Sequence, residues 1–162
     1  MESQRRFAVM GINLFKILNK LCHNQKLCRL LKYQSPNPFS EEFEDVDGSE
    51  LLTKQILYVP KYPEDEVESS YVMAVFNNFI INPTNPDFKL TTIRFEVVCP
   101  YTEWIIDEGN LRPYLLMQEI DDMFNQAKLN GLGNLQFVKC EPLTLSPQMG
   151  GYSMVYQINE FN

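Results

Sequence analysis

The chain has little of what many enzyme and membrane sequences depend on. Histidine occurs once, as His23, so a histidine-rich metal site or a histidine-driven nucleophile would have to be built around that residue. No apolar run approaches the ~20 residues that a helix needs to cross a bilayer. Two arginines near the N-terminus are followed by no compact apolar stretch or small-residue cleavage site, which argues against a signal peptide. We therefore expect a protein made in a reducing cytoplasm, without membrane contact.

Cysteine is also scarce. Four are present, none of them in a Cys-x-x-Cys pair, and all lie within apolar patterns: Cys22, Cys28, Cys99 and Cys140. In a reducing compartment such residues are typically buried free thiols. We expect that state for all four.

The net charge of −7 is unevenly distributed. Residues 1–32 carry +6, residues 33–68 carry −8 and the remainder carries −5. An acidic whole argues against a sequence-reading nucleic-acid binder, because contacts with phosphates supply most of such affinity. A basic end beside an acidic segment suits charge-complementary contact between neighbouring copies. Two differently charged solvated faces would give the same pattern.

The clearest structural pattern lies in residues 90–99. Thr91, Ile93, Phe95, Val97 and Cys99 alternate with Thr92, Arg94, Glu96 and Val98, which is typical of a half-buried strand. Further strands are predicted at 55–59, 71–81, 134–145 and 152–158, with a turn at 148–151. Helices are predicted at 3–22, at 25–32 with Asn24 as N-cap, and at 111–127, with Asn110 as N-cap and Gly131 and Gly133 at the end.

These elements predict an α+β fold. We expect a mixed, mostly antiparallel sheet of 4–5 strands, flanked by an N-terminal amphipathic helical arm and by one helix at 111–127. The 162 residues fit a single domain, with a helical arm at 3–32, an acidic loop at 35–54 and a sheet-and-helix core at 55–162. Apolar content of 44% is ordinary for a globular protein.

No residue pattern marks a reaction centre, and we assign no catalytic, cofactor-binding or metal-binding residue. His23 beside Cys22 would need the thiol and imidazole to meet, but neighbours on a helix point in different directions. Glu119, Asp121 and Asp122 could seed a magnesium site, although acids at that spacing do not converge. Gly131-Leu-Gly133 and Gly150-Gly151 lack the context of a phosphate-binding loop.

Two loops and several aromatic residues are instead candidates for contacts with other proteins. The acidic stretch 41–50 lacks the ligand spacing of an EF-hand, and we expect a mobile surface loop. The loop 82–87 is longer than a tight hairpin turn. The aromatic residues expected on the surface are Tyr58, Tyr62, Tyr71, Tyr152 and Tyr156.

The order of these segments resembles the tail terminator, or tail completion, proteins of the neck of tailed phages. The resemblance covers nearly the whole chain. Its features are a helix with Leu14-Phe-Lys-Ile-Leu-Asn-Lys-Leu, then Leu27-Cys-Arg-Leu-Leu-Lys-Tyr, Tyr58-Val-Pro, Tyr71-Val-Met-Ala-Val-Phe, Thr91-Thr-Ile-Arg-Phe-Glu-Val-Val-Cys, Leu111-Arg-Pro-Tyr, Glu119-Ile-Asp-Asp-Met-Phe, Gly131-Leu-Gly, Leu135-Gln-Phe and Gly151-Tyr-Ser-Met-Val-Tyr-Gln-Ile.

That resemblance implies a structural virion protein without a cofactor. Such proteins form a ring, typically of six copies, that caps the tail tube and joins it to the head connector. The implied partners are further copies, the tail tube protein and the connector proteins, with genomic DNA passing through the lumen unbound. Assembly would take place in the host cytoplasm. The contact residues we select from the two loops are Asn82, Pro83, Asn85, Asp87, Glu41, Glu42 and Asp45.

Three alternatives remain open on the sequence. A head-completion or stopper protein of the neck has a similar size and would form a twelve-fold ring. A metal-dependent hydrolase would use Glu119, Asp121 or Asp122. An acidic protein that mimics DNA and modulates a host protein would rely on the two acidic segments.

Overall fold

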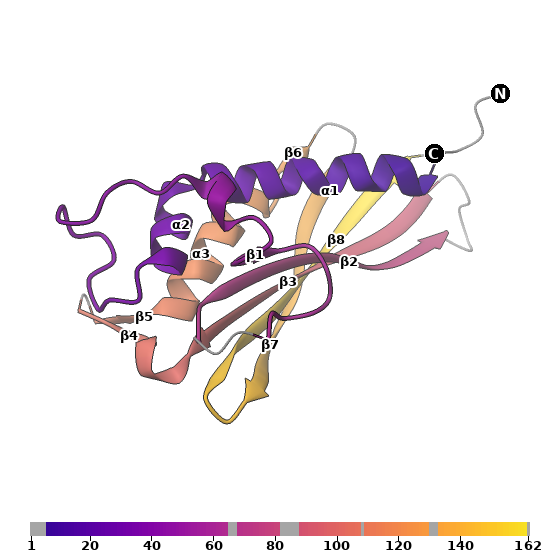
Figure 1. Ribbon diagram of the computed structural model, residues 1–162. Helices are drawn as coiled ribbons and strands as arrows, with labels where there is room; N and C mark the ends of the chain where they lie inside the picture. The colour runs from indigo at the N-terminus through magenta and orange to yellow at the C-terminus, as the bar shows by residue number, and fades with distance from the viewer. Residues whose placement is uncertain (1–5, 65–67, 82–87, 108, 130–132, 162) are drawn as a thin grey trace.

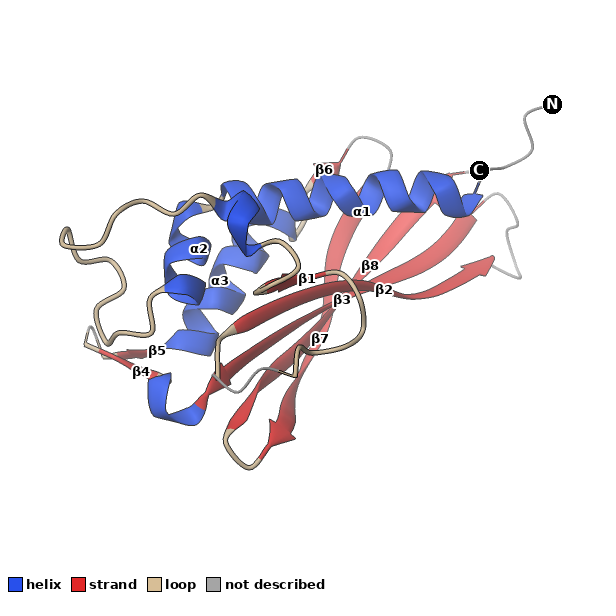
Figure 2. Ribbon diagram, viewed as in Figure 1, coloured by secondary structure: helices blue, strands red, loops and turns tan. Residues whose placement is uncertain are grey.

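Three helices lie on one face of a six-stranded sheet (Figure 1; Figure 2). The computed structural model describes residues 6–64, 68–81, 88–107, 109–129 and 133–161. The helices are α1 (Arg6–His23), α2 (Gln25–Lys32) and α3 (Arg112–Phe124). None of these described helices is long and apolar enough to span a bilayer.

The sheet has the order β1-β2-β3-β8-β7-β6. Only β1 and β2 are parallel, and every other neighbouring pair is antiparallel. A separate two-stranded ribbon joins β4 and β5. The predicted α+β class with a mixed, mostly antiparallel sheet is therefore confirmed, although six strands replace the 4–5 expected. The strands are β1 (Ile56–Leu57), β2 (Tyr71–Ile81), β3 (Phe88–Pro100), β4 (Ile105–Ile106), β5 (Asn110–Leu111), β6 (Lys128–Leu129), β7 (Gly133–Ser146) and β8 (Met149–Phe161).

Strand β3 lies at the centre of the sheet, and its predicted alternation is confirmed. Its five residues expected on one face, from Thr91 to Cys99, are all buried. Phe95 stacks on Phe124 of α3, with ring centroids 5.0 Å apart, and meets Tyr156 of β8 edge-on at 5.7 Å. Helix α3 is therefore packed onto the middle of the sheet by aromatic contacts.

The opposite face of β3 was expected to face solvent, but part of it is buried. Glu96 and Val98 are buried as well, because a second, smaller apolar cluster forms on that face. This cluster joins Met73 and Val98 and is covered by Tyr62 from the segment after β1. Glu96 is accommodated there by an ion pair with Arg94, at 3.2 Å.

Helix α2 begins as predicted, whereas α3 is shorter than predicted. The side chain of Asn24 accepts a hydrogen bond from the backbone N–H of Leu27, which makes it the N-cap of α2. Helix α3 was expected to continue to residue 127, but it ends at Phe124. Gln126 adopts a positive φ of 58° and donates its N–H to the carbonyl of Leu135, so the chain turns into the sheet before the glycines.

Two further details differ from the sequence prediction at the helix start and at the C-terminal hairpin. Asn110 is part of β5, and the cap position of α3 belongs to Leu111, which makes no side-chain cap. Strand β8 already begins at Met149, so Gly150 and Gly151 lie within a strand instead of a turn. Gly151 is paired with Val98 on one side and Leu143 on the other.

A buried arginine ties α2 to the start of α3. Arg112 is fully buried and donates to three backbone carbonyls, those of Leu30, Ser35 and Glu103. Leu30 lies in the last turn of α2, where carbonyls lack partners within the helix. Burial lowers the pKa of the Arg112 guanidinium. The three hydrogen bonds compensate the loss of water around this charge.

A pair of glycine substitutions tests this packing. A Cβ on Gly151 would lie 1.7 Å from the carbonyl oxygen of Val97, whereas a Cβ on Gly11 in α1 would meet nothing within 4 Å. We expect Gly151→Ala to destabilise the fold by about 3 kcal/mol or more, because backbone must move. Gly11→Ala should stabilise it by roughly 0.5–1 kcal/mol through helix propensity. Urea unfolding measures both, and equal effects would contradict the packing described.

Candidate interaction surfaces

The acidic loop (residues 35–54) is organised around a single side chain, Arg29 of α2. Its guanidinium uses all five N–H donors. It donates to the backbone carbonyls of residues 38, 40, 43 and 44, at 2.7–3.2 Å, and to the carboxylate of Asp45 at 3.2 Å. Arg29 itself is buried. The loop therefore supplies the acceptors that a buried guanidinium requires.

Gln25, in the first turn of α2, and Tyr33, directly after its last residue, add to this anchor. Gln25 exchanges two hydrogen bonds with the backbone of Val46, at 2.6 and 2.9 Å. Tyr33 donates its hydroxyl to the carbonyl of Glu44 at 2.6 Å and stacks on Phe43 with ring centroids 4.3 Å apart. Positions 25, 29 and 33 are four residues apart, the spacing of one helix face. We expected a mobile loop, but these contacts fix its path.

The anchored loop presents carboxylates to solvent. Of the residues selected from the sequence, Glu41 and Glu42 are exposed, and Asp45 is exposed while it contacts Arg29. Glu44 and Asp47 are exposed as well. Asp47 accepts hydrogen bonds from the N–H and hydroxyl of Ser49, which lower the pKa of its carboxyl. The other selected residues, Asn82, Pro83, Asn85 and Asp87, lie outside the described residues.

The outer face of α1 combines apolar and basic residues. Phe7, Ile12 and Phe15 are 72%, 60% and 53% exposed, and Lys16 and Lys20 follow on the same helix, also exposed. The described part of α1 contains no acidic residue. The acidic loop and the N-terminal end of α1 lie at opposite ends of the molecule (Figure 1). Phe7 lies at the end of α1 far from the acidic loop, whereas Lys16 and Lys20 lie in its second half, whose last turn packs against Gly48 of that loop. The molecule therefore carries an exposed acidic loop and, as a different surface, an exposed apolar and basic helix face.

The five tyrosines that we expected on the surface are either buried or half-buried. Tyr71 and Tyr156 are buried in the two apolar clusters, whereas Tyr58, Tyr62 and Tyr152 are half-buried. Alternation along a strand does not say which of its faces is covered. The prediction was therefore wrong for Tyr71 and Tyr156, and the exposed aromatic residues of the N-terminal helix were missed.

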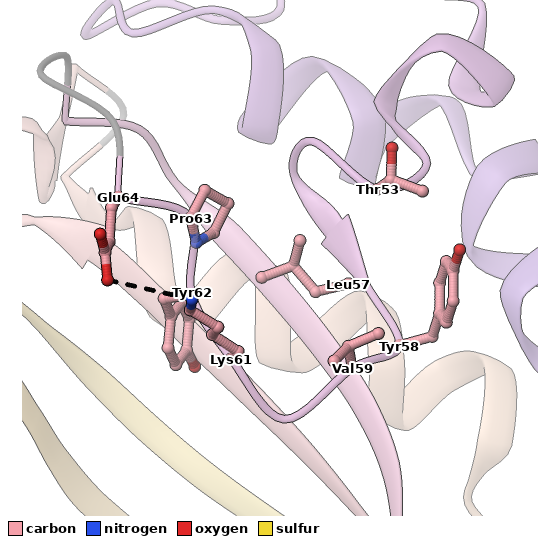
Figure 3. A pocket seen from close by; sticks show the side chains of 8 residues that line it. All are labelled: Thr53, Leu57, Tyr58, Val59, Lys61, Tyr62, Pro63 and Glu64. Atoms are coloured by element: carbon pink, nitrogen blue, oxygen red, sulfur yellow. Dashed lines mark ion pairs between the residues drawn. The ribbon is translucent and has the colours of Figure 1, made fainter.

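A hollow of about 350 Å³ lies along the chain between residues 53 and 64 (Figure 3). It is formed mainly by β1 and the segment that follows, and an ion pair between Lys61 and Glu64, at 3.9 Å, lies at its rim. Tyr58 links the hollow to α1, because its ring lies 6.1 Å from that of Phe15. Its lining residues are Thr53, Leu57, Tyr58, Val59, Lys61, Tyr62, Pro63 and Glu64.

The thiols and His23 do not form a nucleophilic centre. The His23 ring binds the backbone carbonyl of Asn19 at 2.7 Å. Cys28 is buried against the carbonyls of Leu21 and Cys22, and burial raises the pKa of its thiol to about 12. A thiol with such a pKa is protonated at neutral pH and is a poor nucleophile. All four cysteines are free, as expected. Burial is confirmed for Cys28 and Cys99, Cys22 is half-buried, and the expectation was wrong for Cys140, which is exposed.

The three carboxylates considered for a metal site have separate partners. Glu119 accepts from the Asn24 amide at 3.2 Å, Asp121 from the Tyr156 hydroxyl at 2.6 Å, and Asp122 from the Gln118 amide at 2.7 Å. Across the described ranges, no three His, Cys, Asp or Glu side chains come together as metal ligands would. These carboxylates act as structural acceptors.

The described residues form an α+β fold. Its exposed surfaces are its most distinctive feature, and within the described residues we find no pocket of reactive groups. The family model of YomW matches residues 24–158, and because this is most of the chain, the protein belongs to the YomW family. No curated protein matches it. The matched region includes α2, the acidic loop and the sheet as far as residue 158 in β8.

The Arg29 anchor makes a direct prediction. Arg29→Lys replaces five planar donors with three on one nitrogen, so several carbonyls of the acidic loop lose their partner. We expect a loss of about 2–4 kcal/mol in the free energy of unfolding. A glutamyl endopeptidase should also cut faster after Glu41, Glu42 and Glu44. Lys26→Ala, at an exposed site on the same helix, should change stability by less than about 0.5 kcal/mol. Equal behaviour of the two variants would refute the anchor.

Thiol labelling tests the burial of the cysteines. Cys140 should react with iodoacetamide before the other three, because it is exposed. Burial raises the pKa of Cys28 and of Cys99 to about 12, so these thiols should stay unmodified at pH 8 until the fold opens. Mass spectrometry of peptides over time gives the order. Labelling of Cys99 as early as Cys140 would contradict this structure.

Proposed function

We propose that the protein is a structural component of a phage neck, a ring of identical copies that caps the tail tube and joins it to the head connector. The proposal combines the resemblance to tail terminator proteins with one observation in this fold. A fixed acidic loop and an apolar, basic face of helix α1 are both exposed, and they are different surfaces of the molecule. Surfaces of opposite charge favour contact between copies, and because the loop and the helix face are different surfaces, such a contact is head-to-tail.

A head-to-tail contact has a structural consequence. Because the two contacting surfaces differ, each copy leaves one of them open for the next, and the series ends only when it closes into a ring. Phe7, Ile12 and Phe15 would supply the apolar area of the contact, and Lys16 and Lys20 would face Glu41 and Glu42. The contact requires the acidic loop to hold its shape, which is the role of Arg29.

The acidic balance also suits a channel for DNA. A net charge of −7 repels phosphate, so DNA would pass a ring of such subunits without binding to it. On this proposal the protein carries no cofactor and acts by contact with copies of itself, the tail tube protein and the connector proteins.

A charge exchange tests the contact. The variant Lys16→Glu/Lys20→Glu and the variant Glu41→Lys/Glu42→Lys should each self-associate at least about tenfold more weakly than the wild type, measured by sedimentation velocity at low salt. A 1:1 mixture of the two variants should restore association, because acidic helix faces then meet basic loops. Lys128→Glu/Lys139→Glu has the same net charge as the first variant and should behave as the wild type.

Two results would contradict the proposal. Association that survives both charge reversals would place the contact elsewhere on the chain. A mixture that stays as weakly associated as each variant alone would show that these two surfaces do not meet. A twelve-fold closed assembly would favour the alternative of a head-completion or stopper protein.

A further inference from the structure

Strand β7 has an open edge along most of its length. On the side away from β8, the described chain pairs it only with β6, through Gly133 and Asn134. Residues from 136 to 142 are exposed. They include Phe137 and Val138, at 45% and 49% exposure. The hairpin of β7 and β8 protrudes from the body of the sheet (Figure 1). Long exposed edges with apolar side chains are sites where another chain adds a strand.

The register shows which backbone groups of β7 point outward. Leu135 and Phe137 donate their N–H groups away from β8, to the carbonyl of Ala127 and to the side chain of Asn125. Their partners in β8 are Ile158 and Tyr156. In an antiparallel ladder, the backbone N–H and carbonyl groups of successive residues point alternately toward and away from the neighbouring strand. The residues of β7 opposite Met154, Tyr152 and Gly150 therefore also point these groups away from β8.

Those residues are Cys140, Pro142 and Thr144. Pro142 has no N–H to give, and in this register its nitrogen faces outward, so the ladder with β8 loses no hydrogen bond. The open edge therefore offers the N–H and carbonyl of Cys140, the carbonyl of Pro142, and the N–H and carbonyl of Thr144. This set can pair with an extended segment over about five residues.

A hollow of about 340 Å³ lies next to this edge, between α3 and the strands. One wall is the side of α3 that carries Tyr114, Met117 and Asp121, and the other is formed by Phe137, Cys140 and Met154. The sulfur atoms of Cys140 and Met117 lie 3.6 Å apart. Thioether walls adapt to different apolar side chains, so the hollow suits one large apolar residue of an added strand.

The charge of the groove indicates which side chains the added strand should carry. Asp121 lines the hollow, and Asp122 is exposed beside it on α3. On β7, Lys139 and Glu141 pair with each other at 3.2 Å and cancel. The groove between α3 and β7 is thus net acidic, which favours a segment with lysine or arginine near its apolar residue.

We propose that β7 and α3 form a groove that binds an extended segment of another protein by strand addition. The added strand pairs with the outward groups of Cys140, Pro142 and Thr144 and places a leucine, methionine or phenylalanine side chain in the hollow, with a basic residue next to it. Backbone pairing supplies the affinity and the hollow supplies the selectivity. This site is separate from the contact between copies and does not require a ring.

Hydrogen exchange tests the open edge in the protein alone. The amides of Cys140 and Thr144 should exchange at least about tenfold faster than those of Glu141 and Leu143, which face β8. Slow exchange of the Cys140 amide in a dilute monomer would overturn the proposal. Protection that grows with protein concentration would assign the edge to a second copy and would also overturn it.

Peptide selection tests the occupant. A displayed library of 12-residue peptides, selected on the full chain, should yield binders with a basic residue beside a large apolar one, and binding should slow exchange at Cys140 and Thr144. Thr144→Pro, which removes an outward N–H, and Met117→Asp, which places a charge in the hollow, should each weaken binding at least tenfold. The matched variants Thr144→Val and Met117→Leu should bind as the wild type does.

Urea unfolding first shows that the four variants are folded, so that a loss of binding can be assigned to the groove. Binders whose affinity is unchanged by both Thr144→Pro and Met117→Asp would lie elsewhere and would refute the groove. A library that yields no binder, or only binders without a basic residue, would refute the chemistry assigned to the occupant. Failure here leaves the charge-exchange result untouched, because the two surfaces compared there are α1 and the acidic loop.

Discussion

A buried guanidinium has five N–H donors, and each must find an acceptor once water is excluded. Arg29 meets this demand almost entirely with backbone carbonyls of one loop, and Arg112 does the same at the junction of α2 and α3. Removing one such acceptor set leaves a charge poorly solvated, which is costly. The two arginines therefore fix how the irregular parts of the chain are laid against the helices.

The acidic loop follows from that constraint. Its carboxylates repel one another, so a loop of this composition would spread out if nothing held its backbone. Anchoring through carbonyls leaves the carboxylates of Glu41 and Glu42 free to face outward on a fixed scaffold. The same molecule carries an apolar and basic face on helix α1. The chain therefore carries two different surfaces of opposite charge, which are the basis of the ring we propose.

The regular elements could be predicted from the sequence because their cause is local. Strand β2 follows from alternation and α2 from its cap and periodicity, and both were predicted with the bounds observed. The end of α3 could not be predicted, because Gln126 leaves the helix to pair with Leu135. Arg29 was missed as well, since a charged residue in a short helix usually faces solvent. The spacing of Gln25, Arg29 and Tyr33 was the available signal. The open edge of β7 depends on which strands lie beside it, which periodicity does not reveal.

Electron cryo-microscopy of the protein, alone at high concentration and added to tail tubes, tests the central claim most directly. The account predicts a closed six-fold ring on the end of the tube, with the acidic loop of each copy against helix α1 of the next. A monomer that never binds the tube end would contradict the account. A ring whose copies meet through other surfaces, with the acidic loop and α1 both facing solvent, would contradict it equally.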